Sequence, residues 1–186
     1  MSDDEKYFRD WYVAALAPLR SNGDAGFIFA FVSLPLLERY LREKSGAGQV
    51  LQLPIQFYLE LRALFPEIAG KENDLWHCYR NGLLHQAAFS KEKIRHGICV
   101  VMPSAGLSGH DSRPVYYDVP TDSFYMNPVV FFDRVTGAIL ADFATYLGSL
   151  SPAHKLPTIV APSTAVPYIV PTIGAYYPGA TGSYHP

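Results

Sequence analysis

The chain has little cysteine and no excess of basic charge. Only Cys78 and Cys99 occur among its 186 residues, and they form no CxxC or other ligand-spaced pair. Lys and Arg number 15 against 17 Asp and Glu, which gives a formal net charge of −2. These shortages argue against a disulfide scaffold, a cysteine zinc site and a generally basic nucleic-acid binder, so any RNA contact would need a local patch.

The chain also lacks a long hydrophobic run. The N-terminal stretch MSDDEKYF is acidic and has no apolar signal region. The longest apolar run, residues 26–37, is too short to cross a bilayer and contains Pro35. Because 49% of the residues are hydrophobic and only 17% are charged, we expect a globular domain in the reducing cytoplasm, with free thiols and no membrane association.

Capping signals and apolar spacing predict four or five helices. A Ser-x-x-Glu capping box at residues 2–5 predicts a first helix that runs to about residue 20. A second helix over 24–44 should kink near Pro35, and its first half is apolar on almost all sides, as in a central helix. Three more helices are expected, over residues 54–65, from Asn73 or Asp74 to about Ser90, and from Asn127-Pro128 to about residue 147.

Two further segments complete the predicted fold. Residues 94–102 and 115–119 look like strands and predict a small β-hairpin at about 94–119, inserted before the last helix. The segment 151–186 holds seven of the fifteen prolines and almost no charge, but is rich in Val, Ile and Tyr. We expect this tail to lie extended against the body or a neighbouring copy. The predicted class is therefore all-α, a four- to five-helix bundle over 1–150 with a hairpin insertion, followed by an extended Pro-rich tail over 151–186.

The stretch LWHCYRNGLLHQ, residues 75–86, separates polar from apolar side chains when it is placed on a helix at about 100° per residue. The predicted core arc comprises Trp76, Tyr79, Leu83, Leu84 and Ala87. A polar stripe on another face is formed by His77, Asn81 and His85, at i, i+4 and i+8. Arg80 lies between the two faces, and its long stem lets the guanidinium reach the stripe. If two copies pack about a two-fold axis, their stripes meet in one cleft.

Such a cleft suits RNA cleavage without a metal. Histidine is a natural proton carrier near neutral pH, and arginine offers a planar fork of donors to a negatively charged phosphorane. Asparagine can orient a phosphate oxygen. The expected products are a 2′,3′-cyclic phosphate and a 5′-OH, and DNA would not be cut because it lacks the 2′-OH.

At these residues the sequence resembles the HEPN superfamily of small α-helical proteins. The family signature is an Arg, four to six residues and a His within a helix, often with a polar residue after the Arg; here it stands as Arg80-Asn81-Gly82-Leu83-Leu84-His85. The resemblance implies a helical bundle, a homodimer with a composite site, and metal-independent endoribonuclease activity, as in toxins and defence effectors. It makes Arg80 and His85 the catalytic pair and Asn81 the polar helper, with no metal and no cofactor. His77 is outside the signature and is added, from geometry, as a substrate-binding residue.

Alternative functions stay open at this point. The main alternative is a non-catalytic HEPN-like dimerisation module that binds RNA, a nucleotide or a protein in the same cleft; another is a plain assembly domain. An antitoxin or other regulatory protein also stays open as a partner. A zinc site built from His77 and His85 is disfavoured, because eight residues of helix rise about 12 Å.

Overall fold

The computed structural model describes residues 1–22, 25–48, 51–79, 97–100 and 112–148. All of them belong to the first of the two units into which the chain divides, Met1–Leu156 and Pro157–Pro186. The predicted tail at 151–186 and the motif residues 80–86 lie outside the described residues. The division of the chain into a domain over 1–150 and a tail therefore stays a prediction.

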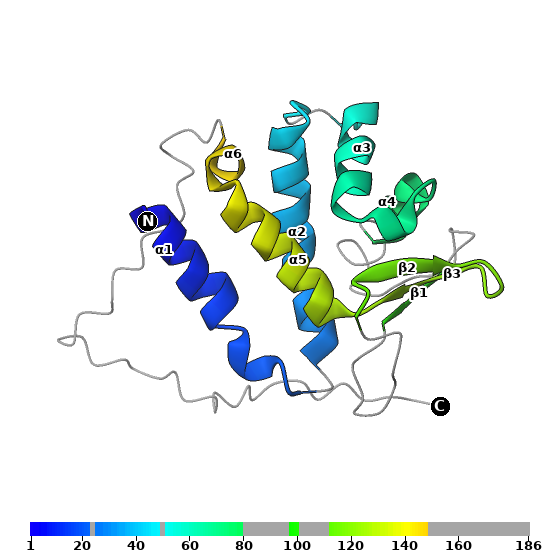
Figure 1. The fold of residues 1–186 in the computed structure, drawn as a ribbon, viewed down its shortest axis with the longest axis horizontal. Coiled ribbons are helices and arrows are strands. Elements are labelled where there is room, and N and C mark those ends of the chain that lie inside the picture. The colour runs from blue at the N-terminus through cyan, green and yellow to red at the C-terminus, as the bar shows by residue number, and fades with distance from the viewer. Residues whose placement is uncertain (23–24, 49–50, 80–96, 101–111, 149–186) are drawn as a thin grey trace, which may run out of the picture. The chain divides into compact units, whose positions relative to one another are not determined.

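The described part is mostly helical, as the sequence predicts. Its helices are α1 (Asp3–Phe8), α2 (Gly26–Lys44), α3 (Ile55–Leu64), α4 (Glu72–Tyr79), α5 (Pro128–Ala141) and α6 (Phe143–Leu147). Helices α2 and α5 pack side by side, with α1 and α6 on one side of this pair and α3 and α4 on the other (Figure 1). Several packed helices thus form the body of the domain, and the finer bundle type stays a prediction.

Helix ends follow the predicted local signals. The Ser2 hydroxyl accepts a hydrogen bond from the Glu5 N–H at 3.1 Å, and the Asn127 side chain accepts one from the Val130 N–H at 3.2 Å. Helix α2 ends before Ser45-Gly46, where Gly46 takes a φ of 68° that suits a residue without Cβ. These caps satisfy polar groups that a helix end leaves without a partner.

The first predicted helix is not one regular α-helix. After α1 the chain continues as a π-helical turn over Arg9–Ala14 and a 3-10 turn over Ala17–Leu19. Pro18 accounts for the second change, because it has no N–H with which to continue the α-helical pattern. The segment is still anchored by Phe8, which is fully buried and meets the Tyr146 ring edge-on at 5.4 Å.

The first half of α2 is less enclosed than its composition suggests. Phe29, Ala30 and Leu34 are fully buried. On the opposite side, Phe27 and Phe31 stack at 6.1 Å and are 39% and 44% exposed. The prediction of a helix that is central on all sides is therefore wrong for this face.

The small β element differs from the predicted hairpin. Strands β1 (Gly97–Val100) and β2 (Val115–Asp118) lie where the sequence predicts strands, but they do not pair with each other. A third strand, β3 (Ser123–Met126), lies between them, antiparallel to β2 and parallel to β1. The predicted small hairpin before α5 is therefore confirmed, but it is formed by β2 and β3 over 115–126 and not by the segments 94–102 and 115–119.

The pairing follows from the lengths of the two connections. Strands β2 and β3 are joined by a short turn over residues 119–122, in which the Thr121 hydroxyl donates to the Asp118 carboxylate at 2.6 Å and Asp122 has a φ of 48°. The segment from β1 to β2, residues 101–114, is much longer. Closing the short turn costs less conformational entropy, so β2 pairs with the strand that follows it.

A buried hydrogen bond joins helix α4 to α2. The Tyr79 hydroxyl, fully enclosed, donates to the Ala30 carbonyl at 2.6 Å. Ala30 lies in the turn of α2 that precedes Pro35. Because proline has no N–H, Pro35 cannot donate to the carbonyl of Phe31, four residues earlier. In the same turn the Ser33 hydroxyl donates to the Phe29 carbonyl at 2.6 Å. Two side-chain hydroxyls therefore donate hydrogen bonds to backbone carbonyls in the turn before the proline.

Replacing the Tyr79 hydroxyl tests this connection. We expect Tyr79→Phe to lower the free energy of unfolding by about 1 kcal/mol, the usual net contribution of a buried hydrogen bond. Urea denaturation followed by circular dichroism measures the change. Tyr125→Phe is the matched control. It removes the same hydroxyl group, but from a half-buried ring that stacks on Tyr116 at 5.4 Å. Equal losses in the two variants would contradict the role assigned to the Tyr79 hydroxyl.

Candidate functional site

Of the four predicted site residues, the structure describes only His77. Its side chain lies on α4 and is exposed. Arg80 follows Tyr79, the last residue of α4, directly in the sequence; Arg80, Asn81 and His85 lie outside the described residues. The convergence of those three side chains therefore stays a prediction, while the helix that leads into them can be analysed.

The predicted separation of faces is confirmed within α4. Trp76 and Tyr79, both predicted in the core arc, are 4% and 1% exposed, whereas His77 is exposed. Cys78 is buried as well. Helix α4 thus turns a wide apolar face inward and keeps the histidine outside.

The start of α4 is held by a buried carboxylate. Glu72, 6% exposed, accepts hydrogen bonds from the Arg62 guanidinium of α3 and, at 2.9 Å, from the N–H of Gly70. Burial alone raises the pKa of the Glu72 carboxyl, but the Arg62 guanidinium and the Gly70 N–H outweigh this and hold the pKa below its ordinary value. The charge pair therefore fixes α4 against α3.

Aromatic packing fixes the remainder of α4. The Trp76 ring meets Phe57 of α3 edge-on at 4.8 Å, and the Tyr79 ring meets Phe131 of α5 edge-on at 5.4 Å. Phe131 in turn stacks on Phe65 at 4.6 Å. Edge-on and offset ring pairs of this kind stabilise a core beyond their buried area. The helix that precedes the motif is therefore packed against both α3 and α5 through aromatic rings.

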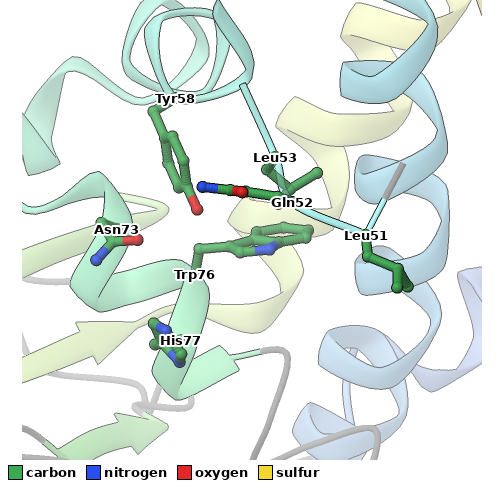
Figure 2. A pocket seen from close by; sticks show the side chains of 7 residues that line it. All are labelled: Leu51, Gln52, Leu53, Tyr58, Asn73, Trp76 and His77. Atoms are coloured by element: carbon green, nitrogen blue, oxygen red, sulfur yellow. The ribbon is translucent and has the colours of Figure 1, made fainter. Parts of the chain in front are cut away.

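A pocket of about 380 Å³ lies beside His77. Its lining residues are Leu51, Gln52, Leu53, Tyr58, Asn73, Trp76 and His77. On α4, Trp76 and His77 both neighbour Asn73 one turn later, at i+3 and i+4, and Tyr58 extends from α3 toward the segment 51–53 (Figure 2). We call this the α4 pocket.

Sequence reasoning predicted His77 in the site and missed the rest of the α4 pocket. The spacing Asn73-x-x-Trp76-His77 was an available signal, since Trp76 and His77 each neighbour Asn73 one helical turn later. Residues 51–53 gave no comparable signal, because they precede α3 and reach the pocket only through the packing of α3 on α4. Such a contact between segments depends on tertiary structure.

The buried thiol on α4 is not prepared for nucleophilic chemistry. Burial, with a smaller contribution from the Asp74 carboxylate, raises the pKa of Cys78 to about 11. The thiol is therefore protonated at neutral pH, and the thiolate is the reactive form.

Within the described ranges, no three His, Cys, Asp or Glu side chains gather as a metal site would require. No helix in the same ranges has both the length and the hydropathy to cross a membrane. Comparison of the chain with protein-family models, with curated proteins and with solved structures finds no match. The family resemblance therefore depends on the motif that follows α4.

The Glu72 carboxylate gives a pH test of how α4 is held. Because its pKa in the folded chain lies below the ordinary value of 4.5, the ionised group stabilises the fold above that pH and loses its contribution as the pH falls through the folded value. We expect Glu72→Gln to have a lower urea midpoint than wild type at pH 7, and the gap to narrow as the pH falls below 4.5. Asp3→Asn, an exposed carboxylate at the start of α1, is the control. A gap of constant size across this range would contradict the assignment.

Thiol labelling tests the burial of Cys78. In a Cys99→Ser variant, where Cys78 is the remaining cysteine, we expect a disulfide reagent at pH 7 to react far more slowly with the folded chain than with the urea-unfolded chain. The raised pKa and the burial both act in this direction. Rapid labelling of the folded variant would show that the thiol is accessible.

Proposed function

We propose that the chain is a metal-independent endoribonuclease of the HEPN type that acts as a homodimer, in the manner of toxins and defence effectors. Arg80, Asn81 and His85 are its proposed catalytic residues. One observation carries the proposal: the motif begins directly after a helix whose phase matches the prediction, with Trp76 and Tyr79 buried and His77 exposed. On the predicted continuation of that helix, Asn81 and His85 share the exposed face of His77.

The proposed reaction is an internal transfer of a phosphoryl group. The ribose 2′-oxygen attacks the adjacent phosphorus and forms a new O–P bond, while the bond to the 5′-oxygen breaks. One His85 of the dimer takes the proton of the 2′-OH, and the other His85 gives a proton to the departing 5′-oxygen. No net proton, water or electron is consumed, so the reaction needs no co-reactant.

The remaining motif residues act on charge and position. Arg80 donates to the oxygens of the phosphorane, where negative charge grows in the transition state. Asn81 orients a phosphate oxygen, and His77, one turn earlier, binds the RNA. The composite cleft supplies the second set of groups, which is why the proposal includes a dimer.

The second candidate is a non-catalytic module that binds RNA, a nucleotide or a protein through the same cleft. The net charge of −2 and a pI of about 6.3 favour it, because an RNase that acts freely on RNA usually has a more positive electrostatic field. This candidate also has the polar stripe and the dimer, but in it the motif residues transfer no proton.

An RNA cleavage assay in EDTA separates the two candidates. The proposed nuclease cleaves a mixed single-stranded RNA pool and leaves 2′,3′-cyclic phosphate and 5′-OH ends, while the same sequences with 2′-deoxyribose stay intact. We expect His85→Ala and Arg80→Ala to lower the cleavage rate by about 100-fold or more, the usual effect of losing a proton-transfer or charge-stabilising group.

His185→Ala is the matched histidine control, because it removes an imidazole in the predicted tail. It should cleave at the wild-type rate. RNA that is retained but not cut would favour the second candidate, and cleavage by His85→Ala at the wild-type rate would overturn the proposed mechanism. Sedimentation of each variant reports whether the dimer is present.

A further inference from the structure

We infer that the α4 pocket binds a nucleobase of single-stranded RNA and so positions the strand at the adjacent motif. The identity of the ligand rests on the proposed function. The observation behind the inference is the combination of two aromatic rings, two amides and an imidazole around one pocket, of which Trp76 contributes the buried ring.

The size of the pocket fits a small planar ligand. Its volume of about 380 Å³ lies near the lower end of the range for small-molecule sites, about 300–1,000 Å³. That space admits one nucleobase with part of its ribose.

The charge of the lining fits a neutral group. None of the seven lining residues is Asp, Glu, Lys or Arg. A phosphate in this pocket would meet no Lys or Arg side chain, and only the His77 imidazole could supply a positive charge, so exchanging its water for this lining is unfavourable. A nucleobase has no such penalty, and its phosphate is left for Arg80 of the motif.

The side chains offer the two kinds of contact that single-stranded RNA uses. Bases stack on aromatic rings and pair their polar edges with side-chain donors and acceptors. Here Tyr58 is half-buried, while the Gln52 and Asn73 amides are exposed at the pocket. In Figure 2 the Gln52 side chain lies between the rings of Tyr58 and Trp76, and Asn73 lies on α4 beside them. Each amide carries both donors and acceptors, so it can read a base edge.

The pocket adjoins the proposed reaction centre in the sequence, since His77 lies three residues before Arg80. His77 lines the pocket and is also the first member of the predicted stripe. On the predicted helix, Asn81 follows it by one turn, a rise of about 6 Å. A base held in the α4 pocket therefore brings a neighbouring phosphodiester to the motif, and makes the pocket a determinant of which strands are bound.

Tryptophan fluorescence provides a direct test. The chain has two tryptophans, Trp11 and Trp76, so Trp11→Phe leaves the pocket ring as the only one. We expect adenosine, guanosine, cytidine or uridine to change the emission of this variant in a saturable manner, and inorganic phosphate not to do so. Saturation-transfer NMR of the same nucleosides with the wild-type chain gives a second reading that does not depend on the substitution.

Pocket variants assign the binding to its contacts. We expect Tyr58→Ala to weaken nucleoside binding about tenfold, since a base–aromatic stack is worth about 1–3 kcal/mol. Asn73→Ala should weaken it for some bases more than for others. Gln56→Ala and Tyr7→Ala are the matched controls, because they remove an amide and a phenol outside the pocket lining.

The outcomes separate this inference from the proposed function. Nucleoside binding that depends on Tyr58, in a chain that does not cleave RNA, would support the pocket and remove the nuclease. Cleavage by wild type with no nucleoside binding, and with an unchanged KM in Tyr58→Ala and Asn73→Ala, would overturn the pocket and keep the nuclease. Emission changes with phosphate alone would also overturn it.

Discussion

The placement of α4 depends on the buried hydroxyl of Tyr79. A hydroxyl enclosed in an apolar core must find an acceptor, because leaving it without one costs about 1–3 kcal/mol. Its acceptor is the Ala30 carbonyl of α2, at 2.6 Å, so the end of α4 is fixed in both distance and rotation. A rotation of α4 by one residue, about 100°, would expose Tyr79 and bury other residues in its place. The exposed position of His77 follows from this constraint.

The start of α4 is held by a different force. Glu72 is paired with Arg62 and with the Gly70 N–H, so a buried charge is compensated at the point where the chain turns from α3 into α4. With one end held by charge and the other by a hydrogen bond, α4 can present Asn73 and His77 on a fixed surface. Sites built on a held helix keep their geometry better than sites on free loops. These contacts at the two ends of α4 therefore fix the position of the helix residues that line the α4 pocket.

The sequence predicts local features better than distant contacts. Asn127 and Ser2 cap the helices they were expected to cap, because an N-cap depends on residues within one turn. The burial of Trp76 and the exposure of His77 follow from helical spacing alone. Strand β3 was missed because four residues give little periodicity, although Phe124 and Met126 alternate with less buried neighbours.

Two other features, a π-helical turn and one wall of the α4 pocket, were also not predicted from the sequence. The π-helical turn at Arg9–Ala14 changes the hydrogen-bond pattern without changing the composition, so no residue type marks it. The segment 51–53 forms part of the α4 pocket only because α3 packs on α4. The motif residues Arg80, Asn81 and His85 are the opposite case: they form a sequence pattern that lies beyond the described helix, and their convergence stays a prediction.

The acidic charge of the chain and the neutral pocket together suggest how an RNA would be selected. Long-range attraction of phosphates needs a basic surface, and a formal charge of −2 supplies none over the whole chain. Under the proposed function, binding energy must then come from short-range contacts to a base, which only an unpaired strand can offer. Duplex RNA keeps its bases stacked and would reach neither Tyr58 nor Asn73. Under the proposed function, a pocket without Lys, Arg, Asp or Glu and a motif with one arginine would thus favour unpaired RNA over duplex RNA.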